Sequence, residues 1–368
     1  MSYITAIGTA TPENKFTQAE IAGFMTKAMN LDYEGARKLN TLFKSSGIEH
    51  RYSVLKDYGS PEKFTFFPNN DNLEPFPSTE KRIRVFRENA LQVSEKAIEN
   101  ALINIPGFSR KEITHLIVVC CTGMYAPGLD VDIVRSLGLP STVQRTCINF
   151  MGCYAAFNAL KVADAFCQAD ANSKVLIVCT ELCSLHFQKE YSDDNLLANA
   201  LFADGSAAVL MEGKTKKETK LKIEVFHSDL STAEGEQAMA WTIGDMGFEM
   251  KLSAYVPTII KDGIQKLTAS LLNKISKKLS DIRYFAIHPG GKKIVEAIER
   301  ELNITKEQNE SAYTVLKNYG NMSSPTVLFV LNEIFGKLTK EDHGEHILSF
   351  AFGPGLTLES MVLKIETQ

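Results

Sequence analysis

AFGPGLTLE, at residues 351–359, is the most distinctive stretch of this 368-residue sequence and the one that decides its fold. Glycines on both sides of Pro354 predict a tight backbone loop after an apolar run. Three other fragments each carry one chemical group: a thiol in GCYAA (152–156), an imidazole in IHPGG (287–291) and a carboxamide in YGNMSS (319–324). We interpret the four fragments as parts of one site, although no single fragment would justify that interpretation.

The composition is that of an ordinary folded protein, with 44% hydrophobic and 23% charged residues. The length predicts two domains or one large duplicated α/β unit. A net charge of −4 without a sustained basic run argues against nucleic acid as a partner. No apolar stretch reaches about 18 residues, which argues against a membrane span. The first residues do not resemble a secretory signal.

All seven cysteines lie between Cys120 and Cys183. Their odd number, together with the missing signal, favours free thiols in a reducing compartment, so we expect the protein in the cytoplasm. There is no Cys-x-x-Cys pair with matching histidines, so no metal site is indicated. No glycine-rich nucleotide motif is present either, so we expect no cofactor of that kind.

Short β-branched runs alternate with longer amphipathic segments along the chain. Such alternation predicts an α/β fold in which helices are layered on a mostly buried sheet. The predicted strands lie at 115–120, 174–179 and 283–287, and the predicted helices at 82–102, 255–275 and 292–302.

The two halves of the sequence also echo each other. In the first half a strand is followed by Gly152-Cys153 and a helix-like run, and in the second half another strand is followed by Gly320-Asn321 and a similar run. The charged stretch 212–220 is the predicted join, which gives an N-terminal half (1–216) and a C-terminal half (217–368). Duplication would bring Cys153 and Asn321 to one pseudo-twofold axis, facing a common cavity.

Each candidate residue has a functional and a structural interpretation. Cys153 opens a run of small residues that predicts a buried helix, whose N-terminus would favour a thiolate; the alternative is a buried structural thiol. His288 lies between an apolar strand and a glycine turn, which would present it to a cavity; the alternative is a hydrogen-bonded core histidine. Asn321 could equally be a helix N-cap.

The combination of the three groups is more specific than any one of them. A thiolate can hold an acyl group as a thioester. Neutral histidine and asparagine side chains can both donate hydrogen bonds to a developing enolate oxygen. Decarboxylation of a malonyl thioester needs such a donor pair and no metal. The three residues therefore predict a decarboxylative Claisen condensation.

These fragments resemble the thiolase superfamily, and specifically the type III polyketide synthases of the chalcone and stilbene synthase family. The resemblance runs from ITAIGTA (4–10) through LFADGSAA (201–208) to the closing loop. It implies a duplicated αβαβα five-layer fold, a homodimer, and no metal or redox cofactor. It also implies that Cys153, His288 and Asn321 form the catalytic triad, and that Phe202 is the gate between a coenzyme A tunnel and the cavity.

Other positions depart from the plant members of the family. Met250 replaces a second gating phenylalanine, Trp241 lies near a small glycine of the starter pocket, and Ala126 replaces a loop residue that reaches the partner's cavity. The remaining substrate-binding positions implied by the resemblance are Cys121, Thr122, Cys183, His186, Ser323 and Gly355. Lys44, Arg51 and Lys56 lie where family members bind coenzyme A phosphates, with a solvated face as the alternative.

These departures imply a bacterial-type member that loads an aliphatic acyl-CoA starter and extends it with malonyl-CoA to pyrone or resorcinol products. One alternative is a fatty-acid-initiating ketoacyl synthase that takes malonyl from an acyl carrier protein and stops after one condensation. The other is a scaffold member of the fold that does not condense. The closing loop and Phe202 favour the first interpretation over the ketoacyl synthase, and the intact triad argues against a scaffold.

Overall fold

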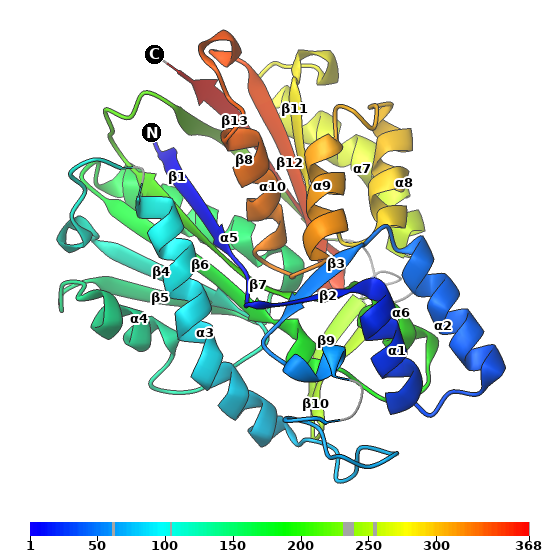
Figure 1. Cartoon of the computed structure of the whole chain (residues 1–368). Coiled ribbons are helices and arrows are strands. Elements are labelled where there is room, and N and C mark those ends of the chain that lie inside the picture. Colours follow the sequence, from blue (N-terminus) through cyan, green and yellow to red (C-terminus); the bar gives the residue numbers. More distant parts are fainter. Residues whose placement is uncertain (61–62, 104, 231–238, 253–255, 368) are drawn as a thin grey trace.

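A computed structural model describes residues 1–60, 63–103, 105–230, 239–252 and 256–367 (Figure 1). Nine strands form one sheet in the order β11-β12-β13-β8-β1-β7-β6-β4-β5. Their bounds are β1 (Tyr3–Ala10), β4 (His115–Cys120), β5 (Gln144–Asn149), β6 (Lys174–Leu182), β7 (Asp204–Glu212), β8 (Lys220–Leu230), β11 (Tyr284–Ile287), β12 (His346–Gly353) and β13 (Thr357–Glu366).

The pairing pattern of the strands repeats in the two halves. In the first half β4 and β6 are parallel, and β7 pairs antiparallel with both β6 and β1. In the second half β11 and β12 are parallel, and β13 pairs antiparallel with both β12 and β8. Among the described residues, β1 and β8 pair in register only at Tyr3–Lys222 and Ile4–Leu221. The halves of the sheet are therefore joined at one end of these two strands and can diverge into separate layers.

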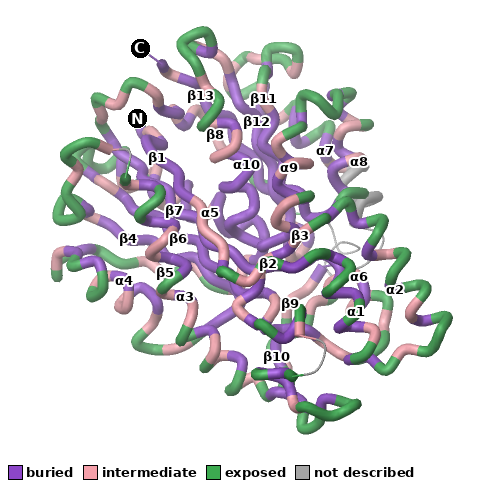
Figure 2. The backbone as a smooth tube through the Cα atoms, in the orientation of Figure 1, coloured by how far each residue is buried: buried purple, intermediate pink, exposed green. Residues whose placement is uncertain are grey.

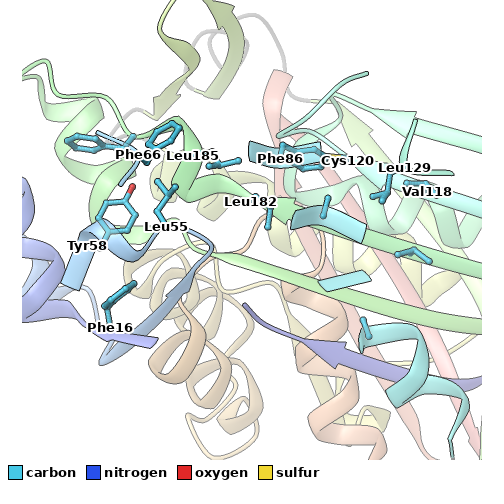
Figure 3. Close-up of a cluster of buried hydrophobic side chains, with 14 of the residues drawn as sticks. Phe16, Leu55, Tyr58, Phe66, Phe86, Val118, Cys120, Leu129, Leu182 and Leu185 are labelled. Atoms are coloured by element: carbon cyan, nitrogen blue, oxygen red, sulfur yellow. The ribbon is translucent and has the colours of Figure 1, made fainter. Parts of the chain in front are cut away.

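Alternation of side chains along the strands separates three buried clusters. Leu116 and Val118 pack with α3 (Thr79–Leu102) and α4 (Leu129–Leu137), and Figure 3 shows part of this first cluster. Ile117 and Val119 belong to the second cluster, with α5 (Ala155–Ala169) and α10 (Thr326–Phe335).

The second half of the sheet completes the layering. Ala286 and Ile347 face the second cluster, while Phe285 and Leu348 face a third, with α7 (Val256–Asn273) and α8 (Lys292–Leu302). The result is five layers, helix–sheet–helix–sheet–helix, as the resemblance implied. Figure 2 shows that the strands and the central helices are the most deeply buried parts.

The predicted elements agree closely with the observed ones. The strand at 115–120 and the helix at 292–302 have the predicted bounds, and α3 begins three residues before the predicted start at Arg82 because Ser78 caps it. The predicted helix 255–275 corresponds to α7, although Tyr255 lies outside the described residues. The predicted join at 212–220 falls between β7 and β8. No helix in the described ranges is long and apolar enough to cross a membrane.

Smaller elements surround one end of the sheet. They are α1 (Gln18–Ala28), α2 (Tyr33–Ser45), β2 (Asn14–Thr17), β3 (His50–Ser53), α6 (Asp193–Leu201) and the hairpin of β9 (Met239–Gly244) and β10 (Gly247–Leu252), whereas α9 (Glu310–Tyr319) lies beside α10. They gather near the ends of β6, β11 and β12 (Figure 1). Those strand ends carry the candidate site.

Candidate active site

Cys153 lies in a single turn of 3₁₀ helix (Gly152–Tyr154) directly before α5. Gly152 has a φ of +76°, and a Cβ atom there would lie 2.4 Å from Cδ of Pro354. A Cβ atom on Gly353 would lie 2.5 Å from the Tyr154 ring. The closing loop 351–359 therefore packs tightly against the cysteine turn, and both contacts require glycine.

His288 directly follows β11, and its backbone N–H donates to the carbonyl of Phe350 at 2.9 Å. The side chain is 1% exposed, and neither ring nitrogen has a hydrogen-bond partner among the described residues. Burial lowers the pKa of His288 to about 3, so the ring is neutral at physiological pH. The alternative of a hydrogen-bonded core histidine does not describe this geometry.

Asn321 precedes α10 and pairs with Phe202 in an isolated β-bridge. Its Oδ1 accepts from the Ser323 N–H at 2.8 Å, and its Nδ2 donates to the Gly290 carbonyl at 3.2 Å. The same Nδ2 lies 4.0 Å from Sγ of Cys153. Because α10 begins at Thr326, directly after Pro325, Asn321 is not its N-cap.

The protonation of Cys153 differs from the sequence-based expectation. The side chain is 5% exposed, and this burial raises the pKa of the thiol to about 11, although hydrogen bonds from Ser323 and Asn321 oppose the rise. This direction opposes the thiolate that was expected at a helix N-terminus. Desolvation outweighs the helix end here because the sulfur lies within the closed cavity.

One cavity is lined by all three triad residues. Its wall contains seven of the nine predicted substrate-binding residues: Cys121, Thr122, Cys183, Phe202, Trp241, Met250 and Ser323. Gly152, Gly290, Pro354, Met239, Leu252, Ile294 and Phe352 complete it. None of these seven was predicted to line the cavity, and two of them, Phe352 and Pro354, belong to the closing loop, whose proximity to the cysteine depends on the fold.

A second cavity adjoins the first behind a partition of four side chains. Cys183, Phe202, Trp241 and Met250 line both cavities. Trp241 and Met250 are directly opposite each other in the β9–β10 hairpin. The indole of Trp241 donates from Nε1 to the Cys121 carbonyl at 2.9 Å, which fixes the ring in the partition.

His186 lines the second cavity, and both of its ring nitrogens are already hydrogen-bonded within the protein. Its Nε2 donates to the Thr122 carbonyl at 2.7 Å and its Nδ1 accepts from the Phe248 N–H at 2.9 Å. The ring also stacks on Phe248 with 4.2 Å between centroids. Both nitrogens are thus occupied. His186 therefore holds the β9–β10 hairpin against the segment that carries Cys121 and Thr122, and its substrate contact stays a prediction.

The remaining predicted positions lie elsewhere. Gly355 has a φ of +103° and shapes the turn between β12 and β13, but within the described chain it does not line the triad cavity. Lys44 and Lys56 are exposed. Arg51, which was predicted to bind coenzyme A, is 4% exposed, lines the second cavity, and donates to Gln18 and to two backbone carbonyls. Its position excludes the alternative of a solvated face.

Glu181 is a buried polar residue that sequence reasoning missed. Its carboxylate accepts from the Cys121 N–H and the Thr122 hydroxyl, at 2.9 and 2.7 Å, and from the Ser324 hydroxyl at 2.7 Å. Burial raises the pKa of this carboxyl, while these bonds oppose the rise. The available signal was a glutamate at the end of an otherwise apolar run, VLIVCTEL (175–182). Within the described residues no cluster of His, Cys, Asp and Glu could hold a metal ion.

Comparison with known families shows where this geometry recurs. The family model for the N-terminal domain of chalcone and stilbene synthases matches residues 1–214, and the model for their C-terminal domain matches residues 226–366. The chain is 31% identical over 371 residues to an "alpha-pyrone synthesis polyketide synthase-like Pks18" of Mycobacterium tuberculosis, covering 99% of this chain and 91% of the relative. It is also 31% identical to "probable polyketide synthase 1" of Dictyostelium discoideum, but it spans only 11% of that protein.

Solved structures agree with the sequence relatives. The C-terminal type III polyketide synthase domain of Steely1, a type I/III hybrid from Dictyostelium, superposes with a TM-score of 0.90 at 29% identity, covering 99% of both chains. PKS-I from the brown alga Ectocarpus siliculosus gives the same TM-score and identity, covering 99% of this chain and 98% of its own.

Proposed function

The chain belongs to the chalcone and stilbene synthase family of polyketide synthases, and from this premise we propose the reaction that its site performs. An acyl-CoA starter is loaded on Cys153, and malonyl-CoA then extends it by repeated decarboxylative condensation. The extended chain cyclises to a pyrone or resorcinol. The observation that carries the proposal is the meeting of the Cys153 sulfur, the Asn321 amide and the unpartnered His288 ring in one buried cavity.

Loading requires that the buried thiol lose its proton. Because its pKa is raised to about 11, the neutral His288 ring is the base that accepts this proton as the thioester approaches. The sulfur then attacks the starter carbonyl. Coenzyme A leaves as its thiol after receiving the proton back from His288. The balance is one acyl-CoA and one thiol giving one acyl-cysteine and free coenzyme A.

Extension uses the same neutral ring in a second role. Malonyl-CoA loses carbon dioxide and its thioester oxygen becomes an enolate oxygen. The Nδ2–H of Asn321 and an N–H of His288 donate to that oxygen in a water-poor cavity, where such bonds are strongest. The enolate carbon attacks the acyl-cysteine carbonyl, and the Cys153 sulfur leaves. The product is a β-ketoacyl-CoA, which reloads Cys153 for the next round.

The partition supports an aliphatic starter. The Trp241 indole occupies the wall between the cavities, which leaves little room for a flat aromatic ring beside Cys183 and Phe202. The unbranched Met250 opposite it suits an irregular aliphatic chain. The relative named for alpha-pyrone synthesis supports a pyrone product. Lys44 and Lys56 remain proposed contacts for coenzyme A phosphates.

The proposed enzyme is a homodimer that needs no metal or redox cofactor. Strand β5 supports the dimer, because it ends the nine-stranded sheet and in the described part pairs with β4 alone. An open strand edge of this kind is a surface at which a second copy can pair. Sedimentation at low micromolar concentration should give twice the chain mass; a single-chain mass would contradict the dimer.

A ladder of acyl-CoA starters of increasing length, incubated with malonyl-CoA, tests the proposal. Products that grow by several two-carbon units, with medium and long aliphatic starters preferred over a coumaroyl starter, support it. Products that stop after one condensation, or extension only from malonyl-acyl carrier protein, favour the ketoacyl synthase alternative. Absence of any condensation would favour a scaffold.

A further inference from the structure

Arg51 lies on β3 and is buried against the C-terminal end of α6, the helix that leads into Phe202. Its Nη1 donates to the carbonyls of Asn199 and Phe202 at 2.8 and 2.7 Å, and its Nε donates to Oε1 of Gln18 at 2.8 Å. The guanidinium also lies over the Phe43 ring, 5.4 Å from its centroid. The guanidinium of Arg51 is thus fixed by partners on several sides.

The last carbonyls of a helix need partners from outside that helix. Here Ala200 receives a hydrogen bond from Nε2 of Gln18 at 2.9 Å, and Leu201 receives one from the backbone N–H of Asn321 at 2.9 Å. With the two bonds from Arg51, the carbonyls from Asn199 to Phe202 are all satisfied. A cation at this end also interacts favourably with the helix dipole.

Asn321 therefore depends on the same helix end as Arg51. Its backbone N–H donates to Leu201, its carbonyl accepts from Ala203 at 2.8 Å, and it bridges Phe202. The residue before it, Gly320, has a φ of +71°, and a Cβ atom there would lie 2.9 Å from both Cγ of Arg51 and the Leu201 carbonyl. Any shift of the α6 end is thus transmitted to Asn321 through two backbone bonds and a tight contact.

We propose that Arg51, together with Gln18, is a positioning residue that holds the end of α6 and through it the catalytic amide of Asn321 and the gating Phe202. This inference rests on the proposed function, because it assigns to Asn321 a role in decarboxylation. Lysine cannot replace the arginine, since three bonds in fixed directions require the planar guanidinium.

Arg82 provides a matched control within the same chain. It is also fully buried, donates from Nε to Pro77 and from Nη1 to Leu185 and Phe187, and lies 4.8 Å from the centroid of the Phe76 ring. In both arginines Nη2 has no partner among the described residues. Within the described part of the chain none of these hydrogen bonds goes to the end of α6, so Arg82→Lys reproduces the loss of a buried guanidinium without the predicted effect on Asn321.

Two rates are measured in Arg51→Lys, Arg82→Lys and Asn321→Ala. The first is the decarboxylation of malonyl-CoA without a starter. The second is acyl transfer to Cys153, which is monitored by the mass of the protein. Misplacement of a catalytic group by about 1 Å can cost on the order of 100-fold. We expect Arg51→Lys to lower decarboxylation about 10- to 100-fold relative to loading. Arg82→Lys should change the decarboxylation rate and the loading rate by the same factor.

If the ratio of the decarboxylation rate to the loading rate is the same in Arg51→Lys and Arg82→Lys, the inference is overturned, whatever the thermal stability of the two variants. If Arg51→Lys does not fold, Gln18→Leu provides the same comparison, because it removes the bond to Ala200 and the acceptor of the arginine. A lower ratio in Gln18→Leu supports the inference and an unchanged ratio overturns it. If Asn321→Ala itself leaves decarboxylation unchanged, the proposed function fails first, and that outcome is distinguishable.

Discussion

The thiol of Cys153 and the ring of His288 form a pair in which neither partner is charged before substrate arrives. Burial raises the pKa of the thiol to about 11 and lowers the pKa of the histidine to about 3. Transfer of a proton from the Cys153 thiol to the His288 ring is therefore unfavourable until a bound thioester changes the polarity around the two groups. The two pKa shifts therefore both favour the uncharged forms at neutral pH.

Alkylation of Cys153 should consequently be slow at neutral pH. We expect its rate with iodoacetamide to rise about tenfold per pH unit between pH 7 and pH 10, because the thiolate is the nucleophile and its fraction rises in that proportion below the pKa. Mass spectrometry of the peptide that contains Cys153 measures the rate separately from the other six thiols. A rate that is already constant above pH 8 would show a thiolate stabilised in the resting enzyme instead.

Asn321 and His288 should be separable by the step that each supports. Removal of one oxyanion donor typically costs on the order of 10²–10³ in rate. We expect Asn321→Ala to lower malonyl-CoA decarboxylation by that factor and to leave loading of Cys153 within a few-fold. His288→Ala should impair both steps. Release of carbon dioxide and the mass of the acyl-enzyme measure them; normal decarboxylation in Asn321→Ala, with poor loading, would reverse the assigned roles.

The proposed starter preference depends on the β9–β10 hairpin, which carries Trp241 and Met250. Trp241→Gly should remove the indole from the partition and extend the range of accepted starters toward bulkier acyl groups. Ile243→Gly is the matched control, because it lies on the same strand with a side chain that is 59% exposed. One methylene changes discrimination by only about 1–3 kcal/mol, so the native enzyme should accept several chain lengths.

Relative kcat/KM values for aliphatic and coumaroyl starters measure this effect in the three proteins. Preference of the native enzyme for coumaroyl-CoA would contradict the interpretation of the hairpin. The same conclusion would follow if Trp241→Gly and Ile243→Gly had identical starter profiles.

Elements buried on both faces were predictable from local sequence, whereas contacts across the molecule were not. The strand at 115–120 was identified because its β-branched run has no polar interruption. The three candidate catalytic residues were grouped because each lies next to or near a glycine that marks a turn, and the structure brings them to one cavity. The hydrogen bonds of Arg51 and His186 could not be predicted, because their partners, such as Phe202 and Phe248, lie 151 and 62 residues away. Nothing local distinguishes a surface arginine from one that holds a distant helix end.

At the scale of the whole molecule, two buried histidines make folding sensitive to acid. The pKa values of His186 and His288 fall from 6.5 to about 3 in the folded protein because burial disfavours the charged ring. Below pH 6.5 the unfolded chain therefore binds protons that the folded chain excludes. The free energy of unfolding should decrease as pH falls from 6.5 to 3, by on the order of 1.4 kcal/mol per pH unit for each histidine.

Replacement of one ring should reduce this acid sensitivity. We expect His288→Gln to lose less stability than the native protein between pH 6.5 and pH 4, whatever its stability at pH 7. Urea unfolding at a series of pH values gives the slope of the free energy of unfolding against pH for the native protein and for His288→Gln. Identical slopes would show that His288 is protonated, or exposed, in the folded protein.

A two-stage mass measurement tests the central claim of a Cys153-bound chain that grows by decarboxylative condensation. A stoichiometric aliphatic acyl-CoA should add one acyl group to the native protein at Cys153 and none at that position in Cys153→Ala. A following pulse of malonyl-CoA should release carbon dioxide and remove the label from Cys153 as a product two carbons longer, or a multiple of that. An unlabelled Cys153, or a labelled chain that malonyl-CoA does not extend, would contradict the account.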